Sequence, residues 1–261
     1  MMLFNGTRAY PERSVKLHFL GTTGYHANDS RQTACLMLPE IGVILDAGTG
    51  MYRARDLIQT SELHIFLTHA HLDHVIGLTF LFDILVERED VDVHVYMAED
   101  KISSVMDHLF HKDLFPAQPN FKVFPFDDKP VKLLDGSTLS TIPLVHPGGS
   151  LGFRLDWPDR SLAYITDTVA SEDAAYTDAI TGVDTLIHEC YFADGWEEKG
   201  TLTGHSCLTP VAQVARKSKA KQVYLVHINP LDEKAEMIDL KSVETICSTM
   251  QIANDLQVID V

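Results

Sequence analysis

Long hydrophobic runs are missing from this 261-residue chain. A helix that crosses a membrane needs about 18 or more consecutive apolar residues. The longest candidate, 75–86, is shorter and contains Asp83. The start of the chain also lacks the basic segment, the apolar stretch and the cleavage site of a secretory signal. These absences predict a cytoplasmic protein with no membrane partner.

Cysteine and positive charge are scarce as well. The four cysteines include no Cys-x-x-Cys pair, so we expect reduced thiols rather than disulfides or a zinc knuckle. The chain has 21 Lys and Arg residues and 37 Asp and Glu residues, which gives a net charge of −16. An acidic surface repels phosphate backbones, although a metal site can supply local positive charge. The composition therefore favours small substrates and argues against tRNA.

Apolar residues, at 45% of the chain, are sufficient for a large core. Short apolar runs bounded by Gly, Pro or Asp predict strands, at 15–20, 33–38, 42–45, 63–67, 91–97, 132–134, 139–145, 151–155, 161–165, 222–226 and 257–261. Helical spacing predicts helices near 73–85, at 101–110, from an N-cap at Thr209, and at 232–250. No repeat or linker divides the chain. We therefore expect one α/β domain over 1–261, an αββα four-layer sandwich with two facing sheets.

The segment 66–74 packs three imidazoles and a carboxylate directly after an apolar strand. Side chains two residues apart on an extended segment share a face, so His69 and His71 can reach one metal ion. The turn into the following helix directs Asp73 and His74 towards a second point. Imidazole and carboxylate are ligands for Zn, Mn or Fe. A group of solvated surface histidines is the alternative, but this segment interrupts two buried runs, where unpaired polar groups are costly.

Three further polar residues follow the ends of apolar strands. His146, Asp167 and His227 each come at or just after the end of such a run. Ligand sites gather at strand ends in layered α/β folds. Together with the cluster they make seven potential ligands, enough for two metal ions.

The order His-x-His-x-Asp-His, then His146, Asp167 and His227, resembles the metallo-β-lactamase superfamily. The resemblance covers nearly the whole chain, and it implies the αββα fold with metal ions at one edge. It also implies two divalent ions, with Zn preferred to Mn or Fe. The implied ligands are His69, His71 and His146 for the first ion and Asp73, His74 and His227 for the second, with Asp167 bridging the pair.

Two later motifs resemble the RNase Z-type phosphodiesterases of that superfamily. His188-Glu189-Cys190 is similar to their His-Glu-Ala-Thr segment, and Gly204-His205-Ser206 to their His-Ser-Thr segment. The resemblance implies that His205 donates a proton near the scissile phosphate and that Glu189 orients it. The sequence departs from RNase Z in two respects. Residues 147–166 leave no room for its long tRNA-gripping insertion, and the composition is acidic where a tRNA enzyme would need basic stripes. The extra cysteine-rich zinc site of a related phosphodiesterase also has no counterpart here.

These features lead to a hypothesis of phosphodiester hydrolysis by a hydroxide that bridges two metal ions. Asp73 accepts a proton from the attacking water, and Asp46 accepts a hydrogen bond from a ligand imidazole. A turn-forming role for Asp46 is an equal alternative. Arg31 and His26, in the loop after the first strand, either contact substrate or are solvated.

Two other functions remain open. The same metal centre can hydrolyse a carboxylic ester, thioester or lactone, in which case His205 and Glu189 are dispensable. The chain can also be a non-catalytic metal-binding module. The resemblance further suggests a homodimer.

Overall fold

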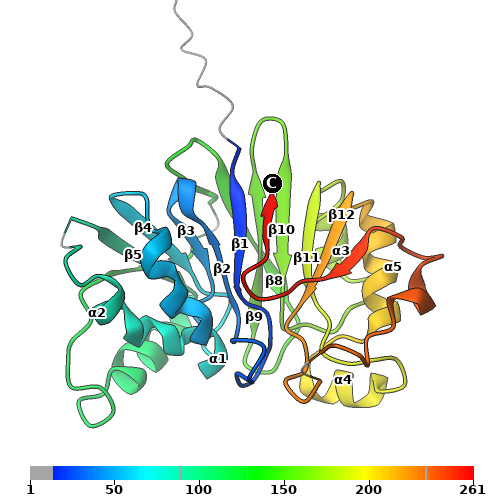
Figure 1. The fold of residues 1–261 in the computed structure, drawn as a ribbon, viewed down its shortest axis with the longest axis horizontal. Helices are drawn as coiled ribbons and strands as arrows, with labels where there is room; N and C mark the ends of the chain where they lie inside the picture. Colours follow the sequence, from blue (N-terminus) through cyan, green and yellow to red (C-terminus); the bar gives the residue numbers. More distant parts are fainter. Residues whose placement is uncertain (1–13, 89, 128, 233) are drawn as a thin grey trace, which may run out of the picture.

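Two seven-stranded sheets face each other in the computed structural model, which describes residues 14–88, 90–127, 129–232 and 234–261 (Figure 1). The first sheet has the order β14-β1-β2-β3-β4-β5-β6. Its strands in chain order are β1 (Lys16–Gly21), β2 (Cys35–Leu38), β3 (Val43–Leu45), β4 (Glu62–Phe66), β5 (Asp92–Met97), β6 (Lys122–Pro125) and β14 (Val258–Asp260). The second sheet has the order β13-β12-β11-β10-β9-β8-β7. Its strands are β7 (Val131–Lys132), β8 (Thr138–Leu144), β9 (Ser150–Asp156), β10 (Ser161–Ile165), β11 (Thr185–Glu189), β12 (Gln222–Val226) and β13 (Met250–Ile252).

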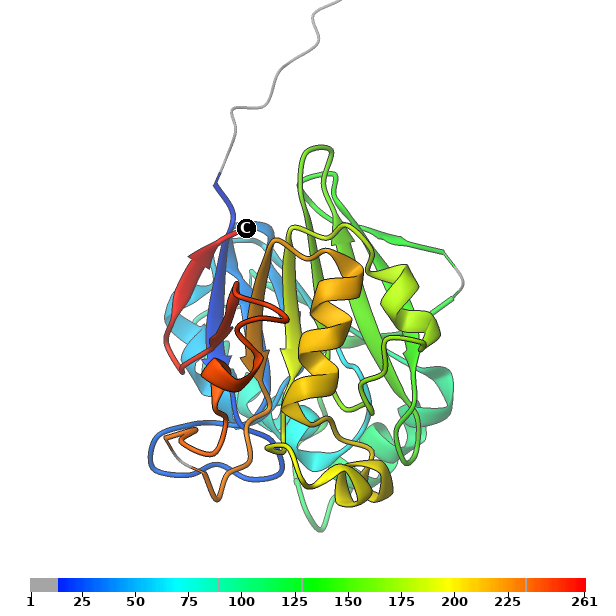
Figure 2. The same ribbon diagram turned by 90° about the vertical axis from the view of Figure 1, so that its right-hand side faces the viewer.

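Helices cover the outer face of each sheet, so the predicted four-layer α/β sandwich is confirmed. The 3-10 helices η2 (Thr49–Leu57) and η3 (Ile76–Phe80) lie with α1 (Leu72–Val75) and α2 (Leu81–Ile84) on the first sheet. On the second sheet, α3 (Ala175–Ala179) packs with α5 (Leu208–Ser218), which crosses the outer face in Figure 2. The remaining helices are η1 (Pro39–Ile41), η4 (Glu99–Lys101), the π-helix η5 (Ser104–Leu109), α4 (Glu197–Thr203) and η6 (Leu240–Val243).

The central strands are continuous apolar runs because both of their faces are covered. All residues of β2, β3 and β10 are buried, as is typical of strands packed between layers. Between the sheets, Phe66, Phe153 and Tyr164 are among the largest members of a core that includes residues of both sheets. This core holds the two sheets, and with them the loops at their ends, in a fixed relation.

The expected helix near 73–85 is divided into α1, η3 and α2. Two backbone hydrogen bonds explain the break: Ala47 N donates to His74 O, and Gly77 N donates to Ala47 O. A Cβ at Gly77 would lie 2.3 Å from Gly48 O, so only glycine permits this approach. The helical segment is thereby fixed to the loop after β3.

The predicted helix over 232–250 is wrong. In the described part of that range the structure has turns, one 3-10 turn (η6) and the start of β13. The Asp232 carboxylate accepts hydrogen bonds from the backbone N–H groups of Glu236 and Met237, and Asp239 accepts one from Lys241 N. Short polar side chains that bind nearby backbone compete with helix formation. The start of α5 also differs, because its N-cap is Cys207 rather than Thr209.

The directions of the strands place the predicted ligand residues at one edge of the sandwich. β3 and β4 are parallel, and so are β10, β11 and β12. β8 and β10 each run antiparallel to β9 and therefore share a direction. The loops that leave β4, β8, β10 and β12 hence start from the carboxyl ends of strands, where ligand sites form in α/β folds.

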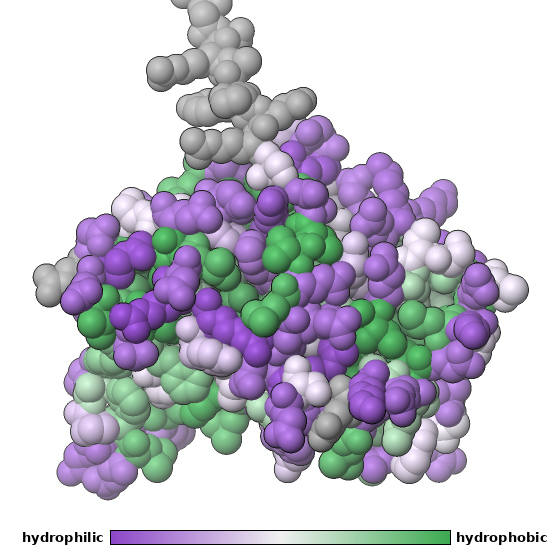
Figure 3. Space-filling view, viewed as in Figure 1, coloured by the Kyte–Doolittle hydropathy of each residue, from purple (hydrophilic) through white to green (hydrophobic). Residues whose placement is uncertain are grey.

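The surface in the view of Figure 3 is largely hydrophilic, which agrees with a chain in which 22% of residues are charged. Among the described residues, no helix combines the length and the apolar character that a membrane crossing requires. The four cysteines are free, as the sequence predicts.

Candidate metal centre

Three of the polar residues near strand ends have a left-handed backbone. The φ angles of Asp46, Asp167 and His227 are 59°, 52° and 53°. Non-glycine residues rarely adopt this conformation, and strained residues of this kind cluster at functional sites. The sharp turn directs each side chain inwards after a buried strand, and Asp46, Asp167 and His227 are all buried.

The first group of side chains contains His69, His71, His146 and Asp167, whose ligand atoms all lie within 4.8 Å of one another. Oδ2 of Asp167 is 3.5 Å from Nε2 of His69 and 3.5 Å from Nε2 of His146. Nδ1 of His71 lies 3.3 Å from Nε2 of His146. The loop after β4 supplies two of these imidazoles, and the ends of β8 and β10 supply the other two ligands.

The second group contains Asp73, His74 and His227. Nε2 of His74 and Nε2 of His227 are 3.3 Å apart, and Oδ2 of Asp73 is 3.4 Å and 3.3 Å from them. The second carboxylate oxygen of Asp167, Oδ1, lies 3.3 Å from both imidazole nitrogens. Asp167 thus faces the first group with one oxygen and the second group with the other. The structure brings all seven sequence-predicted ligands together.

The spacing of these donor atoms fits divalent metal ions. Ligands at about 2.0–2.1 Å around a tetrahedral Zn²⁺ are separated from one another by about 3.3–3.4 Å. The distances here are 3.3–3.5 Å. Nε2 of His69 is buried without a hydrogen-bond partner among the described residues. A buried, unpartnered nitrogen facing a carboxylate is the arrangement that a cation would satisfy.

Asp46 fixes the ring of His74 from behind. Nδ1–H of His74 donates to Oδ2 of Asp46 over 2.8 Å, which leaves the Nε2 lone pair directed at the cluster. The Asp46 carboxylate also accepts hydrogen bonds from the Thr68 backbone and hydroxyl and from the Tyr164 hydroxyl. In the same way, Nδ1–H of His146 donates to Gly204 O over 2.9 Å. Of the two roles considered for Asp46, the contacts are those of a carboxylate that orients a ligand.

The charges in the cluster are strongly coupled. Burial acts to raise the pKa of Asp167, but His227, His74 and His69 lower it well below its usual range. Burial, followed by neighbouring His74, lowers the pKa of His69 well below its usual value. That imidazole is neutral, as a metal ligand must be. Burial alone would lower the pKa of His74, whereas Asp167, Asp73 and Asp46 together raise it.

Glu189 holds His205 beside the two ligand groups. Its fully buried carboxylate accepts hydrogen bonds from Thr168 N (2.7 Å), from Ser206 N (3.2 Å) and from Nδ1–H of His205 (3.3 Å). The His205 ring stacks on Tyr191, with 4.7 Å between ring centroids. Burial lowers the pKa of His205, but Glu189, together with Asp167 and Asp73, raises it to about 9. A nitrogen of His205 lies within 4.8 Å of the ligand atoms of Asp167 and His227.

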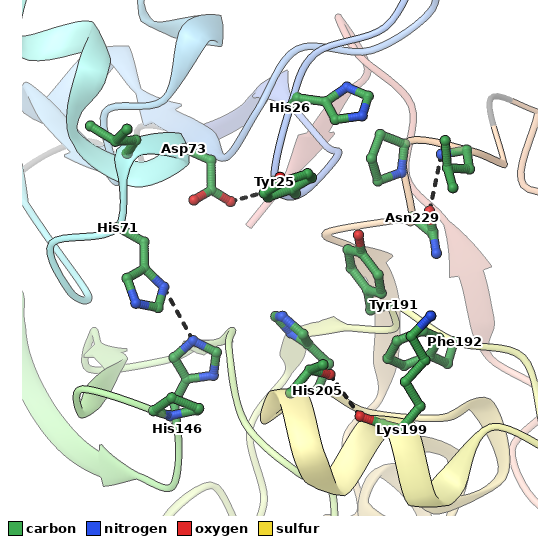
Figure 4. Close-up of a pocket in the computed structure, with 15 residues that line it drawn as sticks. Tyr25, His26, His71, Asp73, His146, Tyr191, Phe192, Lys199, His205 and Asn229 are labelled. Atoms are coloured by element: carbon green, nitrogen blue, oxygen red, sulfur yellow. Dashed lines mark hydrogen bonds between the residues drawn. The ribbon is translucent and has the colours of Figure 1, made fainter.

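A cavity of about 690 Å³ opens onto both groups. Figure 4 shows His71 facing His146 on one side, and Tyr191, Phe192 and Lys199 on the other. His26 lines this cavity, a position from which it could contact substrate, the first of the two alternatives given above. Arg31 does not line it. The Arg31 guanidinium is buried and donates to Thr22, to Ala253 O and to Asn254, so it anchors the C-terminal segment.

Sequence reasoning missed several residues that shape this site. Tyr164 and Thr68 hold Asp46, and Tyr191 and Lys199 line the cavity. Tyr164 carries a hydroxyl on a strand that is otherwise apolar at its centre, which is a signal for a buried hydrogen bond. Tyr191 directly follows the Glu189-Cys190 pair, so its place beside the site could have been inferred. Nothing in the pattern around Lys199 indicates its position.

Gly24 is expected to be essential for the position of His227. A Cβ at residue 24 would lie 2.1 Å from Cε1 and 2.3 Å from Nδ1 of His227. We expect Gly24→Ala to displace that imidazole and to weaken metal affinity about 10- to 100-fold, the usual effect of disturbing a ligand's support. Competition with a chelating dye measures the affinity. Ser30→Ala, at an exposed residue of the same loop, is the control. An unchanged affinity in Gly24→Ala would contradict the expectation.

The comparisons with known proteins agree with this geometry. The family model described as "Beta-lactamase superfamily domain" matches residues 43–228. Ribonuclease Z of Metallosphaera sedula is 23% identical over 82% of this chain and 88% of its own length. The metallo-beta-lactamase fold protein YhfI from Bacillus subtilis superposes with a TM-score of 0.79, at 18% identity, over 95% of this chain and all of that one. The short form of human tRNase Z superposes with a TM-score of 0.73, at 19% identity, over 94% and 99%.

The prediction that argued against tRNA as a partner is therefore wrong. The relatives are named ribonuclease Z, and one structural neighbour is a tRNase Z. The net charge of −16 is a sum over the whole chain, whereas binding depends on local potential near the site. Divalent ions among the seven ligands would supply positive charge where a phosphate would bind.

The matched residues span most of the chain and include all seven predicted ligands. The chain belongs to the beta-lactamase superfamily domain family and is a ribonuclease Z-like, metal-dependent hydrolase of the metallo-β-lactamase fold.

Proposed function

We propose that this hydrolase cleaves phosphodiester bonds and uses two divalent metal ions, with Zn²⁺ as the resident metal. The first ion is held by His69, His71 and His146, the second by Asp73, His74 and His227, and both by Asp167. The observation that carries the proposal is the hydrogen bond between Glu189 and His205 directly beside these ligand groups. An alkoxide leaving group requires a proton donor at this place, whereas an activated ester does not.

The bound metal ions would supply an activated water and neutralise charge on the phosphoryl oxygens. The Asp73 carboxylate lines the cavity, and we propose that it accepts a proton from the attacking water. Its Oδ2 also accepts a hydrogen bond from Tyr25 N over 2.7 Å, which holds the carboxylate at the cavity wall. His205 enters the cavity from the opposite side.

His205 is proposed to donate its proton to the leaving oxygen. Glu189 accepts the hydrogen bond from Nδ1–H, so the proton on the other ring nitrogen is the one available to substrate. Because the Tyr191 ring stacks on the imidazole, the ring cannot rotate freely away from the cavity. Glu189 is itself fixed by two backbone N–H groups and acts as the positioning residue.

The substrate class that we propose includes RNA as well as small phosphodiesters. The cavity is open, and Tyr191 and Phe192 offer aromatic faces on which planar groups can stack. The proposed unit is a single domain over 1–261, because the core between the sheets contains residues from near both ends of the described chain, among them Val15 and Ala253.

A substrate panel tests the proposal. The Zn²⁺-loaded protein is assayed on bis(p-nitrophenyl) phosphate, a dinucleotide, a precursor tRNA, p-nitrophenyl acetate and a lactone. We expect kcat/KM to be higher for the phosphodiesters than for the ester and the lactone. Cleavage of esters or lactones alone would support the competing hydrolase function. Cleavage of none of them, with metal bound, would support a non-catalytic metal-binding module.

A further inference from the structure

A second group of ligand-type side chains lies on the first sheet, at the opposite end of β4 from the metal centre. Glu62 and His64 are on β4, and Asp92 and His94 are on β5, beside it in Figure 1. Residues two apart on a strand point to the same face. The parallel register places Glu62 opposite Asp92 and His64 opposite His94. We call these four residues the β4–β5 cluster.

Three members of the β4–β5 cluster converge on one point. One ligand atom each from Glu62, His64 and His94 lies within 4.8 Å of the others. Nε2 of His64 is 3.3 Å from Oε2 of Glu62. The two imidazoles meet edge to face, with ring centroids 5.0 Å apart. Two imidazoles and one carboxylate, with further positions open to water, form a common ligand set for Zn²⁺ and other first-row metals.

The residues around His64 orient its imidazole ring for metal binding. Its side chain is only 8% exposed, and its Nδ1 lies 3.2 Å from the Tyr96 hydroxyl. When Nδ1–H of His64 donates to that hydroxyl, the lone pair of Nε2 faces the Glu62 carboxylate. Both of these groups are then acceptors that repel each other, and a cation bound between them would remove the repulsion. Glu62 is 42% exposed, so solvent and ions have access.

Asp92 is not one of the proposed metal ligands, because its charge is already paired. Lys122, on β6, forms an ion pair with Asp92, which also accepts a hydrogen bond from Nε2–H of His94 over 3.2 Å. The Lys122 ammonium therefore neutralises Asp92, and the charge of Glu62 is left for a cation. Asp92 orients His94 as a carboxylate orients a metal-ligating imidazole.

We propose that Glu62, His64 and His94 bind a Zn²⁺ ion at a site separate from the catalytic metal centre. The site would hold one ion per chain, with water in the remaining positions. Because its ligands lie at the amino-terminal ends of β4 and β5, the ion would not touch the catalytic cavity. The proposal is independent of the bond that the enzyme cleaves.

Equilibrium dialysis against excess Zn²⁺, followed by elemental analysis, tests the proposal. The wild-type chain is compared with His94→Gln, with Glu62→Gln and with His108→Gln, an exposed histidine outside both clusters. We expect the wild type and His108→Gln to retain one more Zn²⁺ per chain than the other two variants. We also expect the same kcat/KM on bis(p-nitrophenyl) phosphate in all four. The exposed Glu62 provides a second variant if His94→Gln is poorly folded.

Two results would overturn the proposal. Equal zinc content in all four proteins would mean that the β4–β5 cluster is only a set of hydrogen-bonded pairs. Loss of activity together with zinc in folded His94→Gln would mean that the ion belongs to the catalytic centre. A protein with no phosphodiesterase activity that still loses one zinc in these variants would refute the proposed function and leave this site standing.

Discussion

Asp167→Ala is expected to lower kcat/KM for bis(p-nitrophenyl) phosphate by about 10³-fold or more. Metal ions contribute several kcal/mol of charge stabilisation in such hydrolases, and about 1.4 kcal/mol corresponds to a factor of ten. Asp167 faces both groups of ligands, the first through Oδ2 and the second through Oδ1. In the proposed two-metal centre, its loss would therefore disturb both ions rather than one. Steady-state kinetics and zinc content per chain are measured on the same preparation.

Asp159→Ala is the matched control for this prediction. Asp159 is an exposed carboxylate in the turn between β9 and β10, and it pairs only with the neighbouring Arg160 among the described residues. This variant should keep full activity and full zinc content. An Asp167→Ala protein that is folded, retains two zinc ions and is nearly as active as the wild type would contradict the bridging role.

His205→Ala is expected to have a large effect that depends on the leaving group. General acid catalysis contributes about 10²- to 10⁴-fold when the leaving group needs a proton. We expect a loss of this size for a dinucleotide, whose leaving group is an alkoxide, and a much smaller loss for bis(p-nitrophenyl) phosphate. The ratio of the two kcat/KM values, measured in each protein, isolates the proton transfer from any loss of binding.

Two further variants sharpen the test of His205. Glu189→Gln keeps the shape of the positioning residue but removes its charge, so we expect a loss in the same direction and of smaller size. His108→Gln, at an exposed histidine, should leave both rates unchanged. Equal losses on both substrates in His205→Ala would remove the assignment of His205 as the proton donor. Retention of activity in both His205→Ala and Glu189→Gln would favour the ester or lactone hydrolase.

Much of the site could be predicted because its residues follow buried strands. The strands before His69, His146, Asp167 and His227 are recognisable as apolar runs, and the sandwich brings their carboxyl ends to one edge. The residues that orient the ligands were harder to find. Tyr164 reaches Asp46 across the space between the two sheets, a contact that depends on how the sheets pack. Spacing along the chain contains no information on such a contact.

Local patterns failed where long-range contacts decide the backbone. The apolar stretch over 75–85 reads as one helix, but its hydrogen bonds to Ala47 divide it. The segment 232–250 has helical spacing, but the carboxylates of Asp232 and Asp239 bind its backbone instead. The position of Arg31 in the loop after the first strand predicts either substrate contact or exposure to solvent, yet Arg31 is bound to the C-terminal segment, distant in sequence. In each case the deciding partner lies outside the local pattern or competes with it.

We propose that seven side chains on separate strands and loops hold two metal ions side by side. The most direct measurement is the anomalous scattering of zinc in crystals of the protein reconstituted with Zn²⁺. We expect two strong peaks at this edge of the sandwich, one bounded by His69, His71 and His146 and the other by Asp73, His74 and His227, with Asp167 between them. A single peak there, or none, would contradict the proposal.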